Sequence, residues 1–162
     1  MSPGYNLSYP AACIVVGDSL QPSGPLSGGK IFNNICYVSS NTVPLVNCKA
    51  NVTNTVFTNN VFYSASGGAP VLWNSCTNSG NIVGRNPLLS APGTMGEVSS
   101  IAPLSVATRS NYQLSTTSSP AYNAGLDPLA IYSLPWPVHD FYGNAVPKAG
   151  TRIDIGAHEL QQ

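Results

Sequence analysis

Four ionisable side chains near the end of the chain have the residue types of an acid-base site. Asp140, Asp154, His158 and Glu159 all fall between positions 140 and 159. Paired carboxylates act as general acid and base in glycoside hydrolases, and a histidine can transfer protons near neutral pH. The cluster therefore has the chemistry to cleave a polysaccharide, as a hydrolase or a lyase. Its spacing neither requires nor forbids such a site, so no catalytic role is assigned.

The same carboxylates also suit a structural task, which is the favoured interpretation. Asp140 precedes a Gly143-Asn144 pair, so its carboxylate can accept the backbone N–H groups of its own turn, and the pair can take the positive φ that such a turn needs. Asp154 and Glu159 would then fix the last strand to the fold. Basic partners for them are available at two positions, Arg152 and Lys148.

Aromatic side chains near the C-terminal loops are candidates for sugar binding, because aromatic faces stack on sugar rings. The candidate sugar-binding residues are Trp136, Tyr142 and Tyr132. The prolines on both sides of Trp136 would hold its ring stiffly. Trp73 instead lies in an apolar strand pattern and is expected to pack in the core.

The elements that position these residues are predicted to be strands and turns. The chain has 162 residues, of which 43% are hydrophobic and only 7% are charged, against roughly 25% charged in a typical domain. Gly and Pro are abundant and Ser, Thr and Asn supply the polar surface, which disfavours helices. The expected fold class is all-β, and no convincing amphipathic helix is found.

An internal repeat makes the prediction more specific. The triplets at 33–35 and 44–46 and the tyrosine at 37 recur at one constant spacing, at 59–61, 70–72 and 63. Each copy contains apolar strands, such as residues 31–37 and 56–63, joined by polar turns, and such a unit buries its apolar face only by stacking on its neighbours. Stacking would also align Asn33 with Asn59 in a hydrogen-bonded ladder.

The repeat predicts a short right-handed parallel β-helix. Residues 1–90 are expected to form its coils, and residues 91–162 are expected to form a strand and loop cap packed on the solenoid as part of one structural domain. Residues 91–100 are interpreted as the loop that leaves the regular coils.

The composition and cysteines limit the partners and the compartment. Net charge is zero, so neither nucleic acid nor an anionic membrane surface is an expected partner, and no apolar run is long enough for membrane insertion. The four cysteines lack the close pairs of a zinc site, and no metal or cofactor is expected. One or two disulfides and buried free thiols remain open alternatives. The composition favours an extracellular or cell-surface location, although the first residues contain no signal peptide.

Three motifs occur in order near the C-terminus. They are residues 118–125 (SSPAYNAG), 140–147 (DFYGNAVP) and 153–160 (IDIGAHEL). Together they resemble the C-terminal signature of bacterial right-handed β-helix proteins of the pectate-lyase-like superfamily, in particular the choice-of-anchor Q type. The resemblance covers residues 81–160 and implies a cell-surface β-helix associated with polysaccharide. His158 stands where an aromatic residue is usual in that signature, and no catalytic motif of the superfamily maps onto this chain.

A second, local resemblance suggests a different enzyme class. Residues 17–20 (GDSL) follow a short apolar run and resemble the nucleophile block of GDSL esterases, which would make Ser19 the nucleophile. The Asp-x-x-His block of that family is absent, because Asp154 and His158 are one residue too far apart. A simple turn is the favoured interpretation of residues 17–19.

Three function hypotheses follow, in order of preference. The first is an extracellular β-helix module that recognises polysaccharide, or belongs to a protein that processes it, without a complete active site of its own. The second is a structural or adhesive solenoid that stacks on copies of itself through an open β-helix end. The third is a hydrolase, acting on glycosidic bonds through the C-terminal carboxylates or on esters through Ser19.

Overall fold

The computed structural model describes residues 12–17, 26–92, 109–135, 137–147 and 152–161. Nearly all regular structure in this part of the chain is β-strand, with one short helix, α2 (Pro128–Tyr132). The strands are β1 (Ile14–Val16), β2 (Leu26–Ser27), β3 (Lys30–Phe32), β4 (Ile35–Val38), β5 (Val46–Cys48), β6 (Val52–Thr53), β7 (Val56–Thr58), β8 (Val61–Ser64), β9 (Val71–Leu72), β10 (Thr77–Ser79) and β11 (Ile82–Val83).

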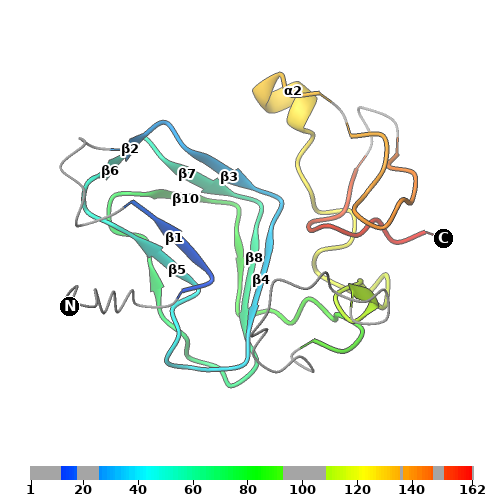
Figure 1. The fold of residues 1–162 in the computed structure, drawn as a ribbon, viewed down its shortest axis with the longest axis horizontal. Helices are drawn as coiled ribbons and strands as arrows, with labels where there is room; N and C mark the ends of the chain where they lie inside the picture. The colour runs from blue at the N-terminus through cyan, green and yellow to red at the C-terminus, as the bar shows by residue number, and fades with distance from the viewer. Residues whose placement is uncertain (1–11, 18–25, 93–108, 136, 148–151, 162) are drawn as a thin grey trace, which may run out of the picture.

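These strands form a short parallel β-helix, as the repeat predicts. Strands of successive coils pair in parallel to give three sheets of three strands, β1-β5-β9, β3-β7-β10 and β4-β8-β11, and the smaller sheet β2-β6. Figure 1 shows the coils stacked behind one another, with β3, β7 and β10 along one side and β4 and β8 along the next. No helix in the described part of the chain is long and apolar enough to cross a membrane.

Strands β2, β3 and β4 of the first coil pair with β6, β7 and β8 at the spacing of the sequence repeat, and the next circuit is shorter. Ile35 pairs with Val61, which is the spacing that the repeat predicts. Val46 pairs with Val71 rather than with the expected position 72, so the circuit from β5 to β9 is slightly shorter. Val61 pairs with Ile82, well before position 87 where the repeat would place its partner, because the third coil makes a shorter circuit. A search at one fixed spacing therefore detects two coils and misses the third.

Each strand expected at 31–37 and 56–63 is divided in two by a corner. Asn33 and Asn59 have φ of 56° and 48°, the left-handed conformation that asparagine tolerates better than most residues. The prediction of single continuous strands was therefore wrong. The chain turns at these asparagines from β3 into β4 and from β7 into β8, and so passes from one sheet to the next.

The asparagine ladder exists, but one residue later than predicted. Asn34 Nδ2 donates to Asn60 Oδ1 at 3.0 Å, and Asn60 Nδ2 donates to Asn81 Oδ1 at 2.8 Å. The backbone N–H groups of Asn34 and Asn60 donate to the same two oxygens. Each internal amide thus both donates and accepts, and the ladder joins all three coils.

Two disulfides lie beside an apolar interior, one within the first coil and one between the second and third coils. Cys13 is bonded to Cys36 and Cys48 to Cys76, and no described cysteine is free. The disulfide alternative is therefore correct, and it indicates folding in an oxidising compartment, as on the extracellular side of a cell. Trp73 contacts the rings of Phe57 and Phe62 edge-on, as its core assignment predicts. The buried members of this core are Val16, Cys36, Leu45, Val46, Cys48, Val52, Phe57, Phe62 and Cys76.

The C-terminal residues pack on the outer face of the β4-β8-β11 sheet. A second buried cluster joins Val61 of the solenoid to Leu114, Ala121 and Ile155. Figure 1 shows this C-terminal part as irregular chain beside β4 and β8, carrying α2. Asn59 Nδ2 and Asn33 Nδ2 donate to carbonyl oxygens of residues 124 and 126, so the corner asparagines attach this part to the coils.

Candidate functional site

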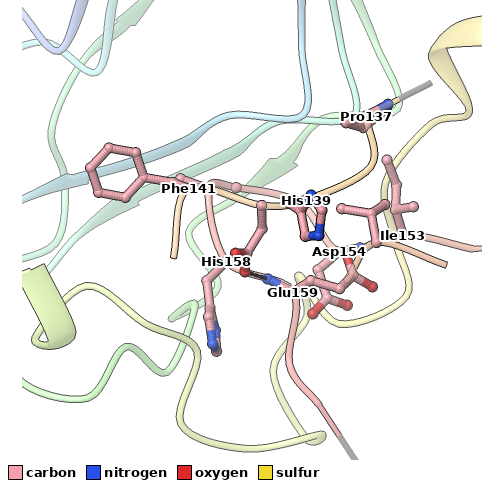
Figure 2. Close-up of a pocket in the computed structure, with 11 residues that line it drawn as sticks. Pro137, His139, Phe141, Ile153, Asp154, His158 and Glu159 are labelled. Carbon is pink, nitrogen blue, oxygen red and sulfur yellow. Dashed lines mark hydrogen bonds between the residues drawn. The ribbon is translucent and has the colours of Figure 1, made fainter. Parts of the chain in front are cut away.

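The second and third C-terminal motifs meet around a small pocket. Its volume is about 170 Å³, and the four predicted acid-base residues all line it. Figure 2 shows Asp154 and Glu159 lying close together below His139, whereas Phe141 projects away from them. The four residues thus lie together, and they come from irregular chain rather than from regular strands.

Asp140 organises its own turn, as predicted. Its Oδ1 accepts the backbone N–H groups of Tyr142 and Asn144 at 2.8 Å, and Gly143 between them has φ of 86°. Its Oδ2 accepts the Asn144 amide and the backbone N–H of Glu159. Burial alone would raise the pKa of Asp140, but these hydrogen bonds together hold it below its ordinary value. The group is therefore an ionised hydrogen-bond acceptor at neutral pH.

Asp154 joins two segments that are distant in the sequence. The carboxylate is 3% exposed, and its two oxygens accept the backbone N–H groups of Asn123 at 2.7 Å and Leu160 at 2.8 Å. The expected pairing with Arg152 or Lys148 is not what holds Asp154: Lys148 lies outside the described residues, and the partners are backbone groups. The reason is that irregular chain leaves N–H groups without strand partners, and a carboxylate satisfies two of them.

Close backbone packing explains why the first motif ends in a glycine, Gly125. The backbone N–H of Gly125 donates to the carbonyl of Ile153 at 2.8 Å. A Cβ on Gly125 would lie 2.7 Å from the Asp154 carbonyl oxygen, which is closer than real side chains approach. The segments carrying the first and third motifs therefore touch through their backbones, and only glycine fits there.

Glu159 differs from Asp140 in the direction of its pKa shift. Burial, aided by the negative charges of Asp154 and Asp140, raises its pKa to about 7, against one hydrogen bond from the Asp154 N–H to Oε2. Among the described residues, Oε1 has no hydrogen-bond partner. At neutral pH Glu159 is therefore only partly ionised, whereas Asp140 beside it is ionised.

His158 and Tyr142 form the outer edge of this arrangement. His158 Nδ1 accepts the backbone N–H of Leu114, and burial lowers its pKa although Asp140 and Asp154 oppose the shift. The imidazole is thus a neutral acceptor that ties the third motif to residue 114. Tyr142 packs edge-on against His158 and donates its hydroxyl to the Arg109 carbonyl at 2.8 Å, so this candidate sugar-binding residue is engaged inside the cap.

Chemically, the pocket offers one acid group rather than a complete acid-base pair. A carboxylic acid with a raised pKa near an ionised carboxylate is the arrangement of a general acid in glycoside hydrolysis. Here both oxygens of Asp140 and of Asp154 are occupied by backbone and amide N–H groups. The two aspartates therefore hold the cap together, and Glu159 is the one residue of the cluster with an unengaged oxygen among the described groups.

The remaining predicted residues lie elsewhere. Ser19 and Trp136 are outside the described residues. Tyr132, at the end of α2, packs on Phe32 of the first coil with ring centroids 4.8 Å apart, and the Lys30 ammonium lies 5.9 Å from its ring. The described His, Cys, Asp and Glu residues include no cluster that could hold a metal ion.

A larger groove lies on the solenoid, where the sequence candidates did not point. Its volume is about 600 Å³, and it lies between the turn at 64–69 and the end of β11. Tyr63 lines it, and its ring lies with its centroid 5.6 Å from that of Tyr37, its partner in the preceding coil, at a tilt of 48°. None of the described residues that line the groove is charged.

The signal for this groove was present in the repeat itself. Tyr37 and Tyr63 recur at the spacing of the repeat, and outward residues at equal positions of successive coils must lie above one another. The aromatic residues near the C-terminal loops are more numerous, which drew the prediction away from this pair. The shape of the groove depends on where the third coil ends, which the repeat does not specify.

No protein-family model, curated protein or solved structure matches the chain. The pocket beside Glu159 and the groove beside Tyr63 are the two candidate sites.

Proposed function

We propose that this chain is an exported β-helix module that binds polysaccharide through the groove at Tyr63. The observation that carries the proposal is the half-buried Tyr37–Tyr63 pair beside an uncharged groove of about 600 Å³. Sugar rings have one face of C–H groups and a rim of hydroxyls, so they suit an aromatic surface with polar, uncharged walls. The volume lies within the range of about 300–1,000 Å³ that is usual for ligand sites.

Two further features support this assignment. The two disulfides fit a protein that works outside the cytosol, where polysaccharides are met. The ordered motifs at 118–125, 140–147 and 153–160 resemble those of surface β-helix proteins associated with polysaccharide. The cap that these motifs build packs on the side of the proposed module, and Glu159 is the group to test if hydrolysis accompanies binding.

The alternative of a self-assembling solenoid is supported by a different observation. All three residues of β10 (Thr77–Ser79) are exposed, and β10 is the outer strand of its sheet. An outer strand can pair with another chain, and repeated head-to-tail pairing of coils gives an open fibre. A second copy would then extend the solenoid.

One experiment separates the two proposals. The oxidised chain is titrated with a panel of soluble polysaccharides, and its mass is followed by light scattering over a concentration series. Binding by a chain of constant mass, weakened about tenfold by Tyr63→Ala, would support the module, since losing one stacking contact costs on the order of 1 kcal/mol. The matched control is Tyr112→Ala, which removes an exposed tyrosine from the cap.

Mass that grows with concentration while no polysaccharide binds would overturn the binding proposal in favour of assembly. Equal binding by the chain and by Tyr63→Ala would show that the groove is not where the polysaccharide sits.

A further inference from the structure

The outward residues at one position of successive coils form a series that changes at the third coil. Tyr37 of β4 pairs with Tyr63 of β8. The next residue in the series is Gly84, because β11 pairs Val83 with Phe62 and the Gly84 N–H donates to the Phe62 carbonyl at 2.9 Å. Two coils therefore present a tyrosine at this position, and the third presents no side chain.

The missing side chain leaves the second side of Tyr63 open. Tyr37 covers the side that faces the preceding coil, with ring centroids 5.6 Å apart. A Cβ built on Gly84 would meet no heavy atom within 4 Å, so the space there is unfilled. Gly84 and Tyr63 both line the groove of about 600 Å³. The open space thus continues the tyrosine series at the point where a third ring would stand.

The opposite wall of the groove is anchored to the coil below it. Ser64 Oγ donates to the carbonyl of Ser40 at 2.9 Å, and Ser66 Oγ donates to the carbonyl of Ser39. The backbone N–H of Ala65 donates to the Val38 carbonyl at 2.9 Å. A wall held in this way does not have to become ordered when a ligand binds, which removes one cost of binding.

We propose that one sugar ring of an uncharged polysaccharide occupies this space and stacks on Tyr63 in place of a third tyrosine. The proposal rests on the proposed function and narrows it to a subsite and a class of glycan. The ring supplies the flat apolar face that the series lacks, and its hydroxyls meet the hydroxyl and backbone groups of the turn at 64–69. An acidic sugar is disfavoured, because no described lining residue could pair with its carboxylate.

The test fills the open space by one substitution. Gly84→Asn introduces a residue type that tolerates the φ of 76° at this position, and its side chain would lie where the sugar would bind. Gly28→Asn is the matched control, since Gly28 has φ of 80° with nothing within 4 Å of its Cβ and lies away from the groove. If Gly84→Asn does not fold, Gly68→Asn narrows the same groove from its other wall, again at a positive φ of 70°.

Binding is measured by titration calorimetry with neutral polysaccharides and with polyuronates. We expect Gly84→Asn to weaken the binding of a neutral polysaccharide at least tenfold and Gly28→Asn to leave it unchanged. The double variant Tyr63→Ala/Gly84→Asn should bind no more weakly than the weaker single variant, because both substitutions remove the same contact.

Each other outcome has a separate meaning. Neutral polysaccharide bound equally well by the chain and by Gly84→Asn overturns the subsite and leaves the proposed function standing. Tighter binding of a polyuronate overturns the assignment to uncharged glycans. No binding of any polysaccharide overturns the proposed function and the subsite together. If the mass of the protein grows with its concentration and Gly84→Asn prevents this growth, the occupant is a second copy of the chain instead.

Discussion

The coils and the C-terminal cap satisfy their buried polar groups in opposite ways. In the coils, parallel strands pair their own backbones, and the ladder through the buried Asn60 is built from amides that donate and accept together. In the cap, the segments from 137 to 161 contain no strand among their described residues, and carboxylates that only accept collect the backbone N–H groups. The side chain that joins the regular coils is therefore a neutral amide that both donates and accepts hydrogen bonds. In the irregular cap it is a carboxylate that only accepts them.

The two regions are joined by side chains of the corner asparagines. Asn33 Oδ1 accepts the Leu126 N–H at 2.8 Å, and its Nδ2 donates to the carbonyl of the same residue at 2.9 Å. Asn59 Nδ2 donates to the Ala124 carbonyl. The left-handed conformation of Asn33 and Asn59 directs their amides out of the coil. The asparagine that follows each of them has its amide in the ladder. The contrast between coils and cap can be tested by exchanging amide and carboxylate in each region.

The largest effect is expected from Asn60→Asp in the ladder. Asn60 is fully buried, and its Nδ2 donates to the carbonyls of Ile31 and Thr58 and to Asn81 Oδ1. A carboxylate would place a buried charge against three acceptors, which should cost about 3–5 kcal/mol of unfolding free energy. Denaturant unfolding measures this loss.

Asn54→Asp is the control for this substitution. Asn54 is exposed and sits in the same coil, so the same chemical change there should alter the unfolding free energy by less than about 0.5 kcal/mol. Similar losses for the two variants would contradict the role given to the ladder.

A smaller and local effect is expected from Asp154→Asn in the cap. One oxygen becomes an NH₂ group that faces the N–H of Asn123 or Leu160, so one buried donor loses its acceptor at a cost of about 1–3 kcal/mol. Hydrogen exchange should accelerate at residues 123 and 160 and remain slow in β7 and β8. Asp127→Asn should be neutral, because Asn caps a helix as well as Asp does at the start of α2. Exchange that accelerates equally in the coils would show that coils and cap unfold as one unit.

The sequence predicted the coils better than the contacts of the cap, for a physical reason. Stacked coils repeat the same environment, so the spacing of Tyr37 and Tyr63 carries three-dimensional information. The corner was missed because adjacent asparagines look alike in a repeat, and only the backbone conformation separates Asn33 from Asn34.

The cap has no such periodicity. Its motifs indicated which residues matter, and the turn around Asp140 followed from local spacing. The contact between Asp154 and the N–H of Asn123 joins positions far apart along irregular chain, so no local pattern encodes it. Disulfide pairing was equally open, since four cysteines allow three connectivities and the sequence fixes none of them.

The smallest and most specific effect concerns the pH dependence of the cap. Burial raises the pKa of Glu159 to about 7 in the folded chain, above the ordinary value of 4.5 expected when the chain is unfolded. Below pH 4.5 the group is protonated in both states, so its stabilising contribution is complete. As pH rises towards 7 the unfolded chain releases this proton and the folded chain keeps it, so the contribution is lost.

Glu159→Gln isolates this effect from other titrations in the pocket. The lowered pKa of His158 contributes stability that is lost as pH falls. Its effect on the unfolding free energy therefore opposes that of Glu159 over the same pH range. In the unsubstituted chain both Glu159 and His158 titrate, whereas in Glu159→Gln only His158 does. The difference in unfolding free energy between the two proteins therefore reports Glu159 alone. A glutamine oxygen can still accept the Asp154 N–H, so the two proteins should be similarly stable at pH 5, and the variant should be the more stable at pH 8. A difference that does not change between these pH values would contradict the raised pKa of Glu159.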